Sequence, residues 1–104
     1  DFDINALGTF NMLEAVRHFC PHAPFIYAST NKVYGLLPHV EVVEGARRYK
    51  IKGKKGVSES EPLDFHSPYG CSKGSADQYV VDYARINGLK TVSFRQSCIY
   101  GERQ

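Results

Sequence analysis

The sequence has no long apolar run. None of its hydrophobic stretches approaches the ~20 consecutive residues that a membrane-spanning helix needs, and no signal-peptide pattern is present. Charge of one sign is also scarce, because 13 Lys and Arg residues oppose 11 Asp and Glu residues and leave a formal net charge of +2. A net charge this small does not by itself indicate binding to nucleic acid. We therefore expect no membrane and no nucleic acid among the partners.

Cysteine is sparse and irregularly spaced. Cys20, Cys71 and Cys98 are odd in number and form no Cys-x-x-Cys pair. A disulfide framework is therefore not expected, and a reducing cytoplasm is the natural compartment. His18 and His22 flank Cys20 and superficially resemble metal ligands, but a proline interrupts the segment and no second cluster follows. A frayed helix end accounts for these residues, and we expect no metal site.

What remains is an ordinary globular composition, with 42% hydrophobic and 23% charged residues over 104 positions. This length suffices for one small domain with a core of its own. The chain starts without an initiator methionine and directly in helical periodicity, so we expect it to be a piece of a longer protein.

Two segments have the apolar spacing of amphipathic helices. From Asp3 to about Phe19, apolar residues recur at steps of three and four, and a pair of prolines follows. From Ser67 to about Asn87 a second apolar face recurs, and Gly88 is a typical helix stop. The sequence therefore predicts two helices, each with one side against a core.

A short apolar strand is predicted after each helix, at residues 25–28 and 91–94. The order is helix, strand, long loop, helix, strand, and a strand–helix–strand unit predicts two parallel strands. Because parallel sheets are normally covered on both faces, two strands alone are an incomplete sheet. The fold class is therefore α/β, as a fragment of a parallel sheet.

The segment between residues 36 and 66 is long, polar and poorly periodic, and we expect it to be a loop. It contains a basic run in which Tyr49 is the only interleaved aromatic residue. This run suits either a solvated loop or contact with an anion, such as a phosphate-bearing ligand or RNA. Its cations are Arg47, Arg48, Lys50, Lys52, Lys54 and Lys55.

The segment Ser67-Pro68-Tyr69-Gly70-Cys71-Ser72-Lys73 has the pattern of a helix start. Ser67 can accept hydrogen bonds from free backbone N–H groups, and Pro68 suits the first helical position. Tyr69 and Lys73 then leave the same helix face one turn apart. Such a pair is either a surface contact or a proton-transfer device, because a nearby positive charge favours the phenolate.

Polar residues follow both predicted strands. Ser29, Thr30 and Asn31 follow the first strand, and Gln96 follows the second. Open α/β sheets place ligands beyond the carboxyl ends of their strands, although turns also favour these residue types. The two groups are therefore candidates for one binding site.

Taken together, these motifs resemble the extended short-chain dehydrogenases/reductases, the family of nucleotide-sugar epimerases and dehydratases. The motifs follow in the family order: Asn5-x-x-Gly8-Thr9, Ser29-Thr30-x-x-Val33-Tyr34-Gly35, Tyr69-x-x-x-Lys73, and Arg95 through Tyr100-Gly101. The resemblance covers nearly all 104 residues and implies the central fragment of an NAD-binding Rossmann-fold domain, with a doubly wound parallel sheet. The glycine-rich dinucleotide motif and the nucleotide-sugar domain lie outside this chain.

The resemblance also implies roles for individual residues. Tyr69 corresponds to the catalytic base, and Lys73 to its partner, which also holds the nicotinamide ribose. Thr30 corresponds to the hydroxyl that binds the reacting oxygen, and Asn5 to a helix asparagine that completes the network. Gln96 falls on the cofactor side. The cofactor-contacting set is Tyr69, Lys73, Gln96, Ala28 and Asn5.

Two departures from the family pattern favour one reaction. Sugar 4,6-dehydratases carry an Asp-Glu pair after the threonine, where this chain has Asn31 and Lys32. Cys98 stands where many members have an asparagine that contacts the substrate diphosphate. The substrate-binding set is therefore Thr30, Asn31 and Cys98. The sequence is most similar to the CDP-paratose 2-epimerase group, which implies a CDP-sugar substrate.

The resemblance thus implies an NAD-dependent epimerase that removes hydride to form a keto-sugar and returns it to the opposite face. A 4-epimerase or reductase of the same family remains an alternative. A non-catalytic derivative of the fold that binds RNA or another anion through the basic run is a second alternative. A homo-oligomeric full-length protein is also expected, and the 104 residues alone are expected to be inactive.

Overall fold

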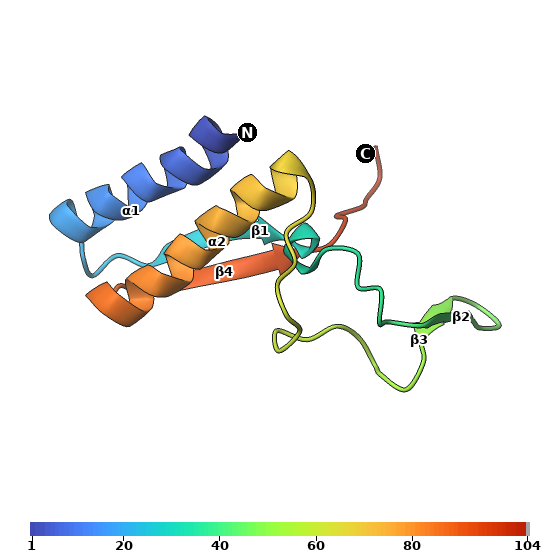
Figure 1. The fold of residues 1–104 in the computed structure, drawn as a ribbon. Helices are drawn as coiled ribbons and strands as arrows, with labels where there is room; N and C mark the ends of the chain where they lie inside the picture. Colours follow the sequence, from blue (N-terminus) through green and yellow to red (C-terminus); the bar gives the residue numbers. More distant parts are fainter. Residues whose placement is uncertain (104) are drawn as a thin grey trace.

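The computed structural model describes residues 1–103. Its elements follow in the order η1 (Phe2–Leu7), α1 (Gly8–Phe19), β1 (Phe25–Thr30), η2 (Asn31–Tyr34), β2 (Val42–Glu44), β3 (Tyr49–Ile51), α2 (Ser67–Asn87) and β4 (Thr91–Gln96) (Figure 1). The first is a π-helical turn and η2 is a 3₁₀ turn. Both predicted helices and both predicted strands are present, so the α/β fold class is confirmed.

Strands β1 and β4 form a parallel two-stranded sheet, in which Phe25 pairs with Thr91 and Thr30 pairs with Gln96. Each strand runs two residues further than the sequence predicts. The extra residues have polar side chains, which the apolar runs do not predict as strand, but they continue the pairing of the two strands. Parallel pairing brings both carboxyl ends to the same edge of the sheet.

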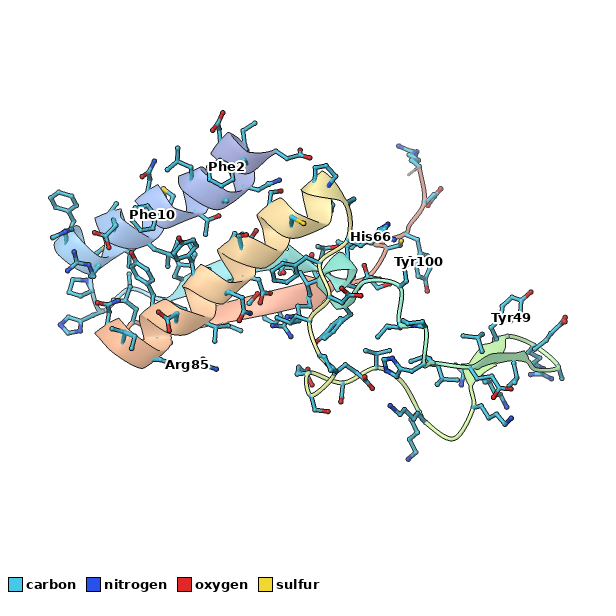
Figure 2. The ribbon with its side chains drawn as sticks, in the orientation of Figure 1. Phe2, Phe10, Tyr49, His66, Arg85 and Tyr100 are labelled. Atoms are coloured by element: carbon cyan, nitrogen blue, oxygen red, sulfur yellow. The ribbon has the colours of Figure 1, made fainter. Side chains whose placement is uncertain are left out.

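The core lies between the two helices and β1. Leu13 of α1 and Val80 of α2 are fully buried, and Tyr27 of β1 packs with them. Phe10 of α1, which is labelled in Figure 2, meets the ring of Tyr79 of α2 edge-on, with 5.6 Å between ring centroids. Helix α2 is therefore the central element, because α1, β1 and β4 all contact it. No helix among residues 1–103 is both long and apolar enough to cross a membrane.

Helices α1 and α2 lie on the same side of the sheet (Figure 1). On the opposite face, Ile26, Val92 and Phe94 are 66%, 41% and 50% exposed. Within residues 1–103 no helix covers these side chains. Because a parallel sheet is normally covered on both faces, this apolar face is the part of the fold that the described chain leaves incomplete.

The expectation of an irregular loop between residues 36 and 66 is wrong for part of that segment. Strands β2 and β3 form an antiparallel hairpin with Val42 opposite Ile51 and Glu44 opposite Tyr49, and Figure 1 shows it projecting away from the helices. Short strands of β-branched and aromatic residues pair here, and the salt bridge between Glu41 and Lys52 extends the pairing by one position.

The two ends of this segment meet beside the sheet. The backbone N–H of Asp64 donates to the carbonyl oxygen of Val33 at 3.0 Å. Gly35 adopts a φ of +65°, and a Cβ there would lie 2.3 Å from the carbonyl oxygen of Asp64. Only glycine therefore suits this crossing. The hairpin extends from a base that closes between η2 and the start of α2.

Candidate functional site

The start of α2 has the geometry expected from its sequence. The Oγ of Ser67 accepts a hydrogen bond from the backbone N–H of Gly70 at 3.2 Å, and Pro68 follows at the first helical position. Ser67 has a φ of +67°, outside the helical range, so it caps the helix although the helical hydrogen bonding begins there. This turn presents Tyr69 and then Lys73 towards the carboxyl end of β1.

Lys73 contacts β1 directly. Its Nζ donates to the carbonyl oxygen of Ala28 at 2.5 Å and lies 4.4 Å from the centroid of the Tyr27 ring. Burial lowers the pKa of Lys73, and the charge of Asp77 opposes this shift. Burial also raises the pKa of Tyr27 to about 12, so that Tyr27 is neutral near pH 7. The ammonium therefore has one strand carbonyl and one aromatic face as partners.

Tyr69 is available for chemistry. Its side chain is 44% exposed, and its phenol forms no side-chain hydrogen bond within residues 1–103. It lies close enough to Tyr27 to contribute to the raised pKa of that residue, after burial and other causes. Tyr69 therefore presents an exposed hydroxyl, which can donate and accept hydrogen bonds, one helical turn from Lys73.

Asn5 connects the N-terminal turn to the same part of α2. Its Nδ2 donates to the Oγ of Ser72 at 3.1 Å, and that hydroxyl donates to the carbonyl oxygen of Tyr69 at 2.9 Å. Asn5 lies in the π-turn η1, where the backbone N–H of Gly8 reaches back to the carbonyl oxygen of Asp3. Such turns recur at functional sites. Sequence reasoning missed Ser72, although its place between Tyr69 and Lys73 was a usable signal.

Thr30 and Gln96 lie side by side where the two parallel strands end. Thr30 is buried; its Oγ1 accepts from the backbone N–H of Lys32 at 3.2 Å and donates to Oδ1 of Asn31 at 3.4 Å. Gln96 and Asn31 are exposed. The structure thus brings the strand-end residues to one edge, next to the carbonyl group that Lys73 contacts.

Two of the predicted groups are not part of this arrangement. Cys98 is exposed in the segment after β4, and within residues 1–103 no hydrogen bond joins it to the site. The basic run lies on the projecting hairpin, where Figure 2 shows Tyr49 (71% exposed). Lys52 and Lys54 there are already paired with Glu41 and Glu61. In the described part of the chain, no three His, Cys, Asp or Glu side chains gather as a metal would require.

Sequence reasoning also missed a buried ion pair beneath the site. Asp77 of α2 is fully buried and accepts two hydrogen bonds from the guanidinium of Arg95, at 2.7 Å and 3.1 Å. The Oγ of Ser93 donates to the same carboxylate at 2.6 Å. The buried hydroxyl of Ser29 also helps to lower the pKa of Asp77. Within residues 1–103, however, the Oγ of Ser29 has no hydrogen-bond partner at a full hydrogen-bond geometry. A carboxylate on the apolar face of a helix was the available signal.

The polar groups at this edge suit one end of a dinucleotide. Within residues 1–103, the ammonium of Lys73 has a single hydrogen-bond acceptor and the phenol of Tyr69 has none, while the amide of Gln96 is exposed. These donors match ribose hydroxyls and a carboxamide. The sequence holds no G-x-G-x-x-G motif, the kind of segment that binds the pyrophosphate of a dinucleotide.

Known proteins resemble this chain in sequence and fold. The chain is 58% identical over 105 aligned residues to CDP-paratose 2-epimerase from Salmonella typhi, with 100% of the chain and 31% of that protein covered. Among solved structures, dTDP-glucose 4,6-dehydratase from Bacillus anthracis in complex with NAD superposes with a TM-score of 0.74 at 31% identity, covering 99% of the chain and 28% of that protein. UDP-glucose 4-epimerase from Thermus thermophilus in complex with NAD superposes with a TM-score of 0.71 at 36% identity. The match covers 100% of the chain and 29% of that protein.

The chain therefore spans about 31% of the length of its Salmonella typhi relative. Over its whole length, residues 1–104, it also matches the NAD dependent epimerase/dehydratase family. The family expected from the motifs is confirmed, and the chain belongs to the NAD dependent epimerase/dehydratase family.

Proposed function

We propose that this chain carries the proton-transfer site of an NAD-dependent nucleotide-sugar epimerase that inverts C2 of a CDP-sugar. The observation that carries the proposal is the hydrogen bond from Lys73 Nζ to the carbonyl oxygen of Ala28, which holds the ammonium at the strand ends where Thr30 lies. The 58% identity to CDP-paratose 2-epimerase supports the choice of substrate class.

The residues after Thr30 support epimerisation over dehydration. Eliminating water from a sugar calls for a general acid and a general base beside the reacting carbons. Asn31 and Lys32 follow Thr30, and neither supplies a carboxylate. Oxidation followed by reduction needs only one proton acceptor, and Tyr69 meets that need.

Lys73, Tyr69, Gln96 and the edge of β1 at Ala28 would hold the nicotinamide half of the cofactor. NAD, when bound, supplies the acceptor and then the donor of a hydride. The chain's own residues accept and return the proton. Tyr69 accepts the proton of the C2 hydroxyl as the C–H bond breaks, and it returns the proton when the C–H bond re-forms on the other face.

The remaining site residues position these groups. Lys73, one helical turn after Tyr69 and held on the carbonyl oxygen of Ala28, would donate hydrogen bonds to the nicotinamide ribose. Thr30 Oγ1 donates to the reacting sugar oxygen after exchanging its hydrogen bond to Asn31. Asn5 keeps the first turn of α2 in place through Ser72. Asn31 and Cys98 lie after the two strands, where the rest of the sugar nucleotide would pass.

We further infer that residues 1–104 form the central part of a Rossmann-fold domain. The exposed apolar face at Ile26, Val92 and Phe94 supports this inference, since it suits further helices packed on the sheet. The activity therefore has to be tested in a complete enzyme. We define the completed enzyme as Salmonella typhi CDP-paratose 2-epimerase in which this chain replaces the matching segment.

The test follows the configuration at C2 of CDP-paratose by NMR. We expect the completed enzyme to epimerise, and Tyr69→Phe to lower kcat by about 10²–10⁴-fold, as removal of a general base does. Tyr79→Phe is a matched control, because Tyr79 lies on the same helix and is 45% exposed, against 44% for Tyr69. Full turnover in Tyr69→Phe, or a folded completed enzyme without turnover, would refute the proposal.

A 4-epimerase is the second candidate, supported by the 36% identity to UDP-glucose 4-epimerase from Thermus thermophilus. The same chain then replaces the matching segment of that enzyme. Turnover of UDP-glucose there, together with no turnover of CDP-paratose in the completed enzyme, would favour the 4-epimerase.

A further inference from the structure

The guanidinium group of Arg95 connects three elements of the fold. Its Nε and Nη2 donate to the two carboxylate oxygens of Asp77 on α2, at 3.1 Å and 2.7 Å. Its Nη1 donates to the phenol oxygen of Tyr34 on η2 at 2.8 Å. Its central carbon also lies 5.2 Å from the centroid of the Tyr34 ring. One side chain of β4 thereby holds both α2 and η2 against the strand.

Hydrogen bonds stabilise the ionised carboxylate of Asp77 in this pair. Burial would raise the pKa of Asp77, but hydrogen bonds from Arg95 and Ser93 outweigh it and hold the pKa below its usual value. The hydrogen bonds to Asp77 raise the pKa of Arg95, so both groups are ionised. A buried ion pair contributes little more stability than apolar packing would. A bidentate guanidinium–carboxylate contact, however, fixes the orientation of the arginine side chain.

Each member of this network shares an element with a residue of the site. Asp77 lies one helical turn after Lys73, and Arg95 directly precedes Gln96. Tyr34 ends the turn that begins immediately after Thr30. Among residues 1–103, the bond from Arg95 to Tyr34 is the only side-chain hydrogen bond that joins η2 to α2 or β4.

We propose that Arg95, oriented by Asp77, is a positioning residue that acts through Tyr34 to place the hydroxyl of Thr30 against the Tyr69 turn of α2. The inference rests on the proposed function, because it assigns Arg95 and Tyr34 to that same site. It predicts that the phenol oxygen of Tyr34 matters to turnover although it does not touch the substrate.

Tyr34→Phe in the completed enzyme is the decisive variant, because it removes one hydrogen bond and keeps the pair of Arg95 and Asp77. We expect kcat with CDP-paratose to fall about 10-fold, as loss of a hydrogen bond to a charged group does when the contact counts in the transition state. The dissociation constant for NAD should not change. Tyr49→Phe, on the exposed hairpin, is the control and should behave as the parent.

A merely structural role gives a different pattern. It would lower the melting temperature of Tyr34→Phe and leave kcat per folded molecule unchanged, and that result overturns the inference. A double-mutant cycle adds a second criterion. Tyr34→Phe should have no further effect on kcat in an Arg95→Met background, whereas additive losses would show that Tyr34 acts independently of Arg95. If Arg95→Met does not fold, the single Tyr34→Phe result decides.

A readout without turnover separates this inference from the proposed function. The backbone N–H of Lys32 donates to Thr30 Oγ1, so its NMR resonance reports on that hydroxyl. Tyr34→Phe should shift the Lys32 amide resonance, and an unchanged resonance overturns the inference even if the completed enzyme is inactive. If Tyr69→Phe abolishes turnover while Tyr34→Phe has full kcat, only the inference about Arg95 fails.

Discussion

The ammonium of Lys73 donates a hydrogen bond to the carbonyl oxygen of Ala28, a residue 45 positions earlier in the chain, at 2.5 Å. The contact joins the catalytic turn of the proposed site to the edge of the sheet. The lysine is therefore placed before any ligand arrives.

Replacing Lys73 should affect chemistry more than stability. Lys73→Met removes the positive charge one helical turn from Tyr69, in the proposed site where negative charge develops as the hydroxyl proton leaves, and we expect kcat of the completed enzyme to fall by about 10²-fold or more. Lys90→Met, at an exposed position after α2, is the control. The measurement is C2 epimerisation by NMR, with circular dichroism to verify folding. Turnover equal to that of the control variant would remove Lys73 from the mechanism.

Asn5 and Ser72 should behave as one unit. Asn5→Ala removes the donor to Ser72 Oγ, and Ser72→Ala removes the hydroxyl that contacts the Tyr69 carbonyl oxygen. Each variant should lower kcat by roughly 10-fold, the effect of one hydrogen bond, and the double variant should lose no more than the worse single one. Additive losses in kcat would show instead that Asn5 acts without Ser72.

Gly74 is the position where α2 tolerates no side chain. A Cβ there would lie 2.4–2.6 Å from ring atoms of Phe65. Gly74→Ala should therefore lower the free energy of unfolding by about 1–3 kcal/mol, as overpacking does. Gly56→Ala is the matched control, because a Cβ at Gly56 has no atom within 4 Å. Urea unfolding of the completed enzyme measures both, and Phe65→Leu should restore part of the loss in Gly74→Ala.

Asp77 should make the fold sensitive to acid. Burial opposes ionisation, but hydrogen bonds from Arg95 and Ser93 hold its folded-state pKa below the ordinary value of 3.8. Its contribution to stability is thus complete above that unfolded-state pKa and is lost as the pH falls through the folded-state pKa. Asp77→Asn should lower the free energy of unfolding at pH 7 by about 3–5 kcal/mol, since it leaves Arg95 without its partner.

The pH dependence supplies the second half of that test. The difference between parent and Asp77→Asn, measured by urea unfolding, should shrink as the pH is lowered below about 4. Asp82→Asn, at an exposed position of the same helix, is the control and should follow the parent. A difference that stays constant with pH would mean that Asp77 acts through its shape and not its charge.

The hairpin cations outside the two ion pairs described above should not serve the catalytic site. Replacing Arg47, Arg48 and Lys50 by serine leaves the two ion pairs of Lys52 and Lys54 intact. We expect kcat and KM for CDP-paratose to match the parent, because Figure 1 shows the hairpin projecting away from α1 and α2. Salt-sensitive RNA binding that disappears in this variant would favour the anion-binding alternative instead.

Local sequence signals were sufficient for both ends of α2 and for the presence of β1 and β4, whereas the π-helical turn η1 before α1 was not predicted. The cap at Ser67 and the stop at Gly88 are confirmed, because each depends on backbone groups within a few residues. Strand ends were less predictable, since Thr30 and Gln96 are polar residues that follow short apolar runs and equally suit a loop, whereas the structure pairs them with each other. The hairpin was missed because its strands have three residues each, too few for a periodic pattern.

The site was predictable only in part. Tyr69, Lys73 and Thr30 carry motifs, but the acceptor that Lys73 finds on β1 depends on how α2 crosses the sheet. Asp77 and Arg95 form an ion pair although they are 18 positions apart in the chain. Tyr34, the second hydrogen-bond partner of Arg95, is 61 positions away from it. No local pattern encodes such contacts. A charged residue on an apolar helix face indicates only that a partner must exist.

The closed base of the hairpin segment has a practical consequence. Because Asp64 and Val33 are joined by a hydrogen bond and Gly35 crosses beside them, the length of chain between these points can change while its ends stay in place. Gly53 lies just after β3, and a Cβ there would have no atom within 4 Å. A reporter peptide or fluorescent label inserted at Gly53 would therefore allow the protein to be detected without a change in its catalytic activity.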